Sequence, residues 1–151
     1  MKGGAEMPAY LISTLAKAGN NPIVKLVAIA IVVDTLFGVL RAIKERKFNS
    51  NFGINGAIRK CGMIITILAL ACVDQVVKVN LIGFIPEVAR TYLPVQTVGT
   101  MEFFALLFIA YETTSILKNM TLCGLPVKRI WIYVKKALGK YTDELGENVE
   151  I

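Results

Sequence analysis

Three long apolar runs dominate the pattern of hydrophobic and polar positions. They occupy about residues 23–43, 62–79 and 98–118. Each run is close to the about 20 residues that an α-helix needs to cross the hydrocarbon core of a bilayer. The pattern therefore predicts an all-α membrane protein, with three transmembrane helices in a membrane domain over residues 23–118.

Two weaker patterns flank these spans. In residues 1–22, an apolar stripe that ends before Gly19–Pro22 predicts a short external or interfacial helix, or a loose tail. Residues 80–97 contain Pro86 and Pro94, which interrupt any long helix. We expect these residues to form an external connector that dips into the lipid headgroups.

The segment 119–141 predicts a basic amphipathic helix that opens near Pro126. Its apolar face comprises Val127, Ile130, Trp131, Val134, Leu138 and Tyr141, and the opposite arc comprises Lys128, Arg129, Lys135, Lys136 and Lys140. Such a helix suits an anionic inner leaflet. We expect contact with the membrane surface through Lys128, Arg129, Trp131, Lys135 and Lys136; packing on a sister subunit is the alternative. Residues 142–151 are acidic and predicted to be disordered.

The distribution of charged residues predicts how the chain is oriented in the membrane. The net charge is +6, and the loop Lys44–Lys60 carries five basic residues against one acid. Lys and Arg favour the cytoplasmic side of a membrane. With this loop inside, the inner segments hold twelve basic residues and the outer segments five. We therefore expect a membrane protein with its N-terminus out and its C-terminus in, and no nucleic-acid partner.

Four acidic residues interrupt the spans: Asp34, Asp74, Glu102 and Glu112. A carboxylate facing lipid at mid-span costs on the order of 2.5–3.5 kcal/mol. Asp74 has Lys78 four residues later and could form a local ion pair, and protonation of the acids is another solution. We favour homo-oligomers that shelter the acids, which makes Asp34, Asp74, Glu102, Glu112 and Thr113 candidate pore-lining or inter-subunit residues.

Catalytic and metal-binding patterns are absent from the sequence. There is no histidine, and the spacing of Cys61, Cys72 and Cys123 fits neither a zinc site nor a disulfide framework. The sequence motifs of membrane proteases and hydrolases are missing as well. We therefore expect no enzyme activity, no cofactor and no metal.

Several motifs together resemble those of the small phage-lysis and toxin-secretion holins. The match extends from Asp34 to Lys136, and no single motif is specific alone. It comprises the pair Asp34 and Gly38, the loop motif Ser50, Gly53, Gly56 and Lys60, Asp74 at the end of the second span, and the run Glu112, Ser115-Ile116, Asn119 and Gly124-Leu125-Pro126.

The resemblance implies copies that gather in the bacterial inner membrane and open it, which releases an endolysin or another folded protein. Gly53 and Gly56 would permit a tight bend or a close helix approach, and we expect Gly56 at a subunit contact. Met7 is a possible second start. A small ion channel or transporter subunit is the alternative function, and a membrane scaffold that recruits a cytoplasmic partner is a further one.

Overall fold

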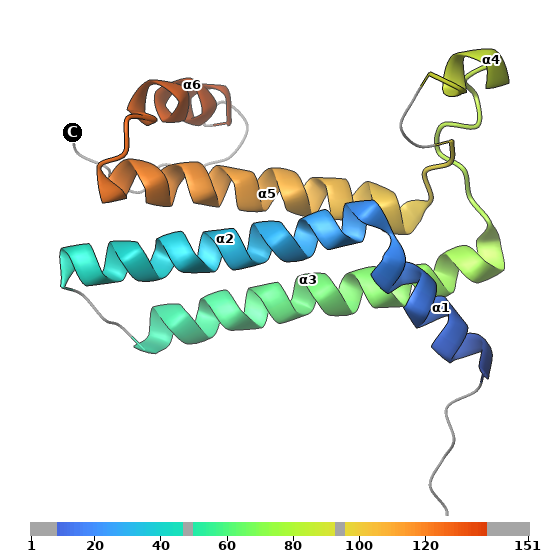
Figure 1. Cartoon of the computed structure of the whole chain (residues 1–151), viewed down its shortest axis with the longest axis horizontal. Coiled ribbons are helices and arrows are strands. Elements are labelled where there is room, and N and C mark those ends of the chain that lie inside the picture. The colour runs from blue at the N-terminus through green and yellow to red at the C-terminus, as the bar shows by residue number, and fades with distance from the viewer. Residues whose placement is uncertain (1–8, 47–49, 93–95, 139–151) are drawn as a thin grey trace, which may run out of the picture. The chain divides into compact units, whose positions relative to one another are not determined.

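The computed structural model describes residues 9–46, 50–92 and 96–138. All regular elements in these residues are helices (Figure 1). Their bounds are α1 Ala9–Asn20, α2 Pro22–Glu45, α3 Ser50–Val77, α4 Glu87–Arg90, α5 Thr100–Cys123 and α6 Lys128–Leu138.

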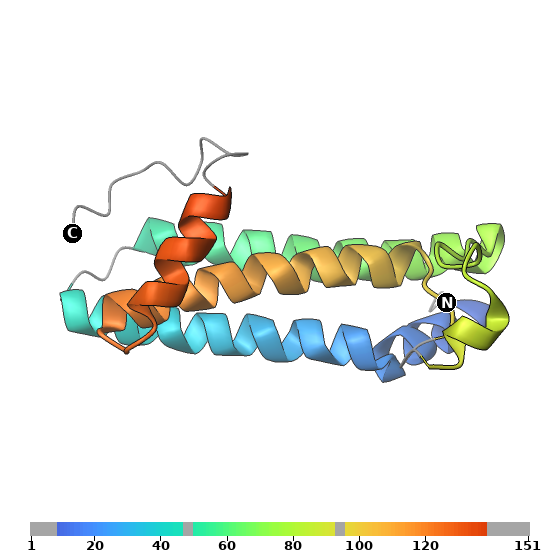
Figure 2. The same cartoon turned by 90° about the horizontal axis from the view of Figure 1, so that it is seen from above.

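Three of these helices are long and apolar enough to cross a membrane: α2, α3 from Gly53 onward, and α5. For the described residues, the predictions of an all-α chain and of three helices that can span a membrane are thus confirmed. The predicted basic amphipathic helix near the C-terminus is present as α6. The two views in Figures 1 and 2 show each of the three as one unbroken helix.

Burial along the long helices follows a narrow stripe. In α2 the stripe contains Val27, Ala30 and Asp34, and in α3 it contains Met63 and Ile67. Most of the large apolar side chains on the other faces of these helices are exposed. Such exposed apolar surface is expected where lipid, and not water, surrounds a helix.

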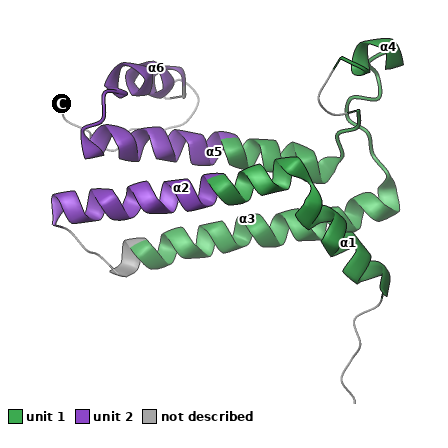
Figure 3. Cartoon of the chain, in the orientation of Figure 1, with its two compact units in different colours: residues 1–29, 49–109 green, residues 30–48, 110–151 purple. Residues whose placement is uncertain are grey.

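The chain divides into two compact units (Figure 3). Unit 1 comprises residues 1–29 and 49–109, and contains α1, α3, α4 and the first parts of α2 and α5. Unit 2 comprises residues 30–48 and 110–151, and contains the remaining parts of α2 and α5 together with α6.

In unit 1, α1 contacts α3 and leads directly into α2. Asn21 is the single residue between α1 and α2, and its Oδ1 accepts hydrogen bonds from the backbone amides of Ile23 (2.9 Å) and Val24 (3.4 Å). Pro22 follows as the first helical residue, where its missing N–H costs nothing. Asn21 is therefore the N-cap of the first span.

The predicted loop Lys44–Lys60 is shorter than expected, because α3 already begins at Ser50. Ser50, Gly53, Gly56 and Lys60 are helical, so the expectation of a tight bend at the glycines is wrong. The segment holds no proline, and each glycine costs a helix only about 1 kcal/mol. The apolar helix that follows the glycines runs on to Val77, and the stability gained by forming it outweighs that cost.

The end of α5 in unit 2 is closed by a Schellman motif. The amide of Leu125 donates to the carbonyl of Met120 (3.1 Å), and the amide of Gly124 donates to that of Thr121 (3.0 Å). Gly124 has a φ of +91°, which glycine adopts without steric cost. Lys44 Nζ from the end of α2 donates to the Leu122 carbonyl (2.9 Å), so a cation also stabilises this negative helix end.

Gly124→Ala is predicted to destabilise the chain by about 1–2 kcal/mol, because a Cβ is disfavoured in the left-handed conformation. That Cβ would also lie 3.1 Å from Lys44 Nζ. Denaturant unfolding in a mild detergent, followed by circular dichroism, measures the loss.

Gly62→Ala is the matched control, since Gly62 lies inside α3 and a Cβ there meets no atom within 4 Å. Alanine favours a helix over glycine by about 1 kcal/mol, so this variant should be as stable as the wild type or more stable. Equal destabilisation by the two variants would contradict the role of Gly124.

Candidate functional site

Asp74, near the end of α3, accepts hydrogen bonds from the first residues of α5. Its Oδ1 accepts from the backbone amide of Thr100 (3.0 Å) and from the Thr100 hydroxyl, and its Oδ2 accepts from the amide of Met101 (2.8 Å). The first amides of a helix have no partner within the helix. Asp74 thus caps α5 from a different span, and its negative charge lies at the positive end of the helix dipole.

Glu102, in the first turn of α5, completes the cap. Its Oε2 accepts from the backbone amide of Gly99 (2.9 Å), the residue directly before the helix. A Cβ on Gly99 would lie 2.6 Å from Asp74 Oδ2 and 2.9 Å from Glu102 Oε2. Glycine is needed here because a side chain would displace the two carboxylates.

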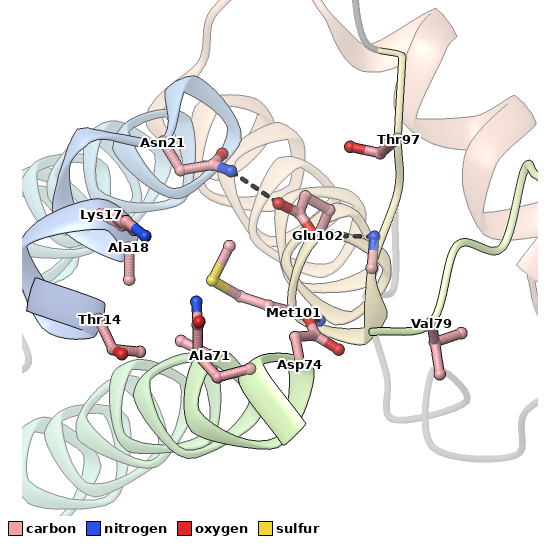
Figure 4. A pocket seen from close by; sticks show the side chains of 12 residues that line it. Thr14, Lys17, Ala18, Asn21, Ala71, Asp74, Val79, Thr97, Met101 and Glu102 are labelled. Atoms are coloured by element: carbon pink, nitrogen blue, oxygen red, sulfur yellow. Dashed lines mark hydrogen bonds between the residues drawn. The ribbon is translucent and has the colours of Figure 1, made fainter. Parts of the chain in front are cut away.

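Asn21 joins the first span to this cap, since its Nδ2 donates to Glu102 Oε1 (2.8 Å; Figure 4). We call Asn21, Asp74, Gly99 and Glu102 the carboxylate clasp. Through it, the start of α2, the end of α3 and the start of α5 are hydrogen-bonded together within unit 1.

A cavity of about 250 Å³ lies beside the clasp, between α1, α3 and the start of α5 (Figure 4). Thr14 and Lys17 of α1 line it together with Gln75 of α3. The clasp carboxylates at its wall already bond to amide donors. The cavity is therefore a partly polar space that lies against α1 within unit 1.

A second polar contact joins α2 and α5 inside unit 2. Asn119 Nδ2 donates to Asp34 Oδ1 (3.0 Å), and both side chains are buried, with exposed fractions of 9% and 4%. Gly38 lies one turn after Asp34 and near the same amide, since a Cβ there would lie 3.9 Å from Asn119 Nδ2. This is an ordinary van der Waals distance, so the contact does not by itself require glycine.

Glu112 and Thr113 differ although they are neighbours on α5. Glu112 is fully buried, and Thr113 is exposed. Asp34 and Glu112 therefore lie inside the folded chain, as do the bonds made by Asp74 and Glu102. Shelter of the carboxylates does not by itself require a second copy of the chain; their place in a pore wall or subunit contact stays a prediction.

The structure favours the cap over the predicted local pair of Asp74 with Lys78. Helix α3 ends at Val77, and Lys78 has a φ of +50°. The amide of Lys78 still donates to the carbonyl of Asp74 (3.0 Å), but its positive φ is not the helical conformation on which an i,i+4 side-chain pair depends. Asp74 instead turns its carboxylate to α5.

The loop motif is spread along the first part of α3. Added Cβ atoms on Gly53 or Gly56 would meet no atom within 4 Å, so this glycine face is open in the described chain. Lys60 is half-buried. No close approach of another described element to Gly53 or Gly56 is present, and a contact with a second copy stays a prediction.

Helix α6 has the predicted basic character, but its tryptophan is turned inward. Trp131 is only 5% exposed, whereas Lys128, Arg129 and Lys136 are exposed and Lys135 is half-buried. Trp131 is therefore not available for the membrane contact that we predicted from the sequence, because the folded chain covers its ring. Lys140, Tyr141 and the acidic tail 142–151 lie outside the described residues, as does Met7.

Sequence reasoning did not assign the partners of the acids: Asn21, Gly99, Thr100 and Asn119. Asn21 before Pro22 is a recognisable helix start, and Gly99 lies three residues before Glu102, which is the spacing of a capping box. Asn119 belongs to the holin-like run, but neither it nor Thr100 gives a local signal for its role, because each bonds to a residue of another helix.

Comparisons with known proteins give a consistent result. A sequence profile described as the bacteriophage holin family matches residues 12–141. The chain is also 46% identical over 138 residues to "Holin-like protein TcdE" of Clostridioides difficile, which covers 91% of this chain and 83% of that protein. No solved structure matches.

Asp74→Asn is predicted to destabilise the folded chain by about 1.5–3 kcal/mol, the range for hydrogen bonds to a charged group. An asparagine keeps one acceptor oxygen but turns an NH₂ group toward a backbone amide. Unfolding in mild detergent measures the effect.

Lys78→Gln is the control that separates the two interpretations of Asp74. If Asp74 caps α5, this variant should unfold like the wild type. A loss as large as that of Asp74→Asn would support the ion pair and contradict the cap.

Proposed function

Because this multi-pass membrane protein belongs to the bacteriophage holin family, we propose that it is a holin of the bacterial cytoplasmic membrane. Copies of the chain accumulate there as oligomers and then open lesions. The lesions release an endolysin or another folded protein. The chain acts by assembly and not by catalysis.

The buried polar side chains of unit 2 carry this proposal. Asp34, Glu112 and Asn119 are enclosed, while large side chains on other faces of the same helices, such as Leu36 and Leu40, are exposed and apolar. Exposed apolar faces suit lipid. A transmembrane helix with one polar face and otherwise apolar faces can be accommodated in a membrane in two ways.

In the first way, the chain encloses its polar face, as in this structure. In the second, several chains turn that face toward a shared aqueous lesion. Exposure of the ionised acid to lipid is disfavoured by about 2.5–3.5 kcal/mol for a mid-span carboxylate. We propose that opening is the change from the first arrangement to the second, which gives Asp34 and Glu112 their place in the lesion wall, with Asp74, Glu102 and Thr113 nearer to subunit contacts.

Two surfaces support assembly at the membrane. The open glycine face of α3, with Gly53 and Gly56, permits close approach of a helix from a second copy. The exposed Lys128, Arg129 and Lys136 of α6 suit the anionic inner leaflet. Together with the distribution of Lys and Arg, this favours an N-terminus outside and a C-terminus inside.

Induced expression in a bacterium tests the function. With a potential-sensitive dye present, a holin should leave the membrane potential unchanged during a delay and then collapse it suddenly. A co-expressed endolysin should lyse the cells at that moment, and endolysin alone should not. Graded ion leakage without endolysin release would instead indicate a channel, and an unchanged potential would indicate a scaffold.

Glu112→Leu is predicted to delay or abolish lysis. Leucine has a similar volume but lacks the carboxyl group of this fully buried acid, so the lesion wall would lose a polar group. Removing one partner of a buried polar contact also destabilises a fold, so lysis times are compared at equal protein level. The measurement is the time from induction to lysis, with the protein level in the membrane fraction checked by immunoblot.

Leu107→Ala is the matched control, because Leu107 lies on the same helix and is exposed. Its lysis time should equal that of the wild type at equal protein level. Wild-type timing for Glu112→Leu at equal level would refute a role for the buried acids in opening.

A further inference from the structure

The connector between α3 and α5 exposes three large side chains at intervals of four residues. Phe84 is 83% exposed, Val88 75% and Tyr92 86%. Phe84 lies in the turn before α4, Val88 within α4 and Tyr92 in the turn after it. These values are among the highest of all large apolar side chains in the described residues.

The base of this connector is closed by hydrogen bonds. The amide of Leu81 donates to the carbonyl of Val98 (2.8 Å). Asn80 Oδ1 accepts from the amides of Ile82 and Val98, at 3.2 Å each. These bonds join the beginning of the connector to its end, on either side of α4.

The position of the loop is set by the spans. Helix α3 ends at Val77 and α5 begins at Thr100, so the connector starts and finishes where two membrane helices leave the hydrocarbon core. Figure 1 shows α4 at this end of unit 1, apart from the long helices. Val76 and Val77 in the last turn of α3 are also exposed, so large apolar side chains are exposed both at the end of this span and in the connector.

We propose that the connector is a membrane-interface anchor that seats Phe84, Val88 and Tyr92 in the phospholipid headgroup region. Aromatic side chains favour this region, where one end of the side chain is in apolar and the other in polar surroundings. Glu87 is exposed on the same short helix and remains in water. The lipid surface is the expected partner because the connector joins the ends of two helices that are long and apolar enough to cross a membrane.

Site-directed fluorescence in phospholipid vesicles tests the anchor. Cysteines replace Phe84, Val88 or Tyr92 one at a time, in a full-length chain whose Cys61, Cys72 and Cys123 are changed to alanine, and carry an environment-sensitive fluorophore. Quenching by spin-labelled lipids should place these labels about 5–10 Å into the headgroup and acyl boundary. Aqueous iodide should quench them weakly.

Glu87→Cys is the matched control on the same helix, and its label should be quenched strongly by iodide and weakly by the lipids. Circular dichroism verifies that every labelled chain is folded. Equal iodide quenching at all four positions would overturn the anchor, and so would labels shielded from both iodide and spin-labelled lipid, which would indicate protein contact.

This result is independent of lysis. The anchor depends on the three spans alone, so a chain that proves to be a channel or a scaffold would leave the vesicle result unchanged. Conversely, a holin whose connector labels lie in water would retain the proposed function and lose the anchor.

Discussion

The structure depends on one constraint: the amide groups at the start of α5 have no partner within their own helix. In a membrane protein these donors cannot be left unpaired at low cost. Asp74 supplies acceptors from α3, and Glu102 supplies one from the first turn of α5 itself. Asn21 then connects the same carboxylate of Glu102 to the start of α2. An acid inside an apolar run is thus a structural element as much as a candidate for function.

This arrangement explains which features could be predicted from the sequence. Length and hydropathy are local properties, and they gave the number of long apolar helices correctly, although α3 begins at Ser50 and not near the predicted residue 62. The partners of the acids were not predictable, because Asp74 bonds to residues 26 and 27 positions away and Asp34 to a residue 85 positions away. Lys78 was the only residue of opposite charge at helical spacing from Asp74. The sequence does not reveal that Lys78 has a left-handed backbone conformation.

The errors at the two basic segments have different physical causes. Charge and glycine content suggested a loop up to Lys60, although a helix tolerates both when an apolar span continues it. In α6 the period of the apolar residues was read correctly, but a period does not distinguish lipid from protein as the partner of Trp131. The first error therefore concerns secondary structure, and the second concerns what covers a helix face, which periodicity alone does not determine.

The separation between bonded residues also constrains how the chain enters a membrane. Asp74 is synthesised before Thr100 and Met101, and Asn21 long before Glu102. A hairpin of the first two spans alone would hold a carboxylate without its amide donors. Asp74 therefore gains its amide donors only when the third helix is in place, and the carboxylate clasp is completed by the last span to be inserted.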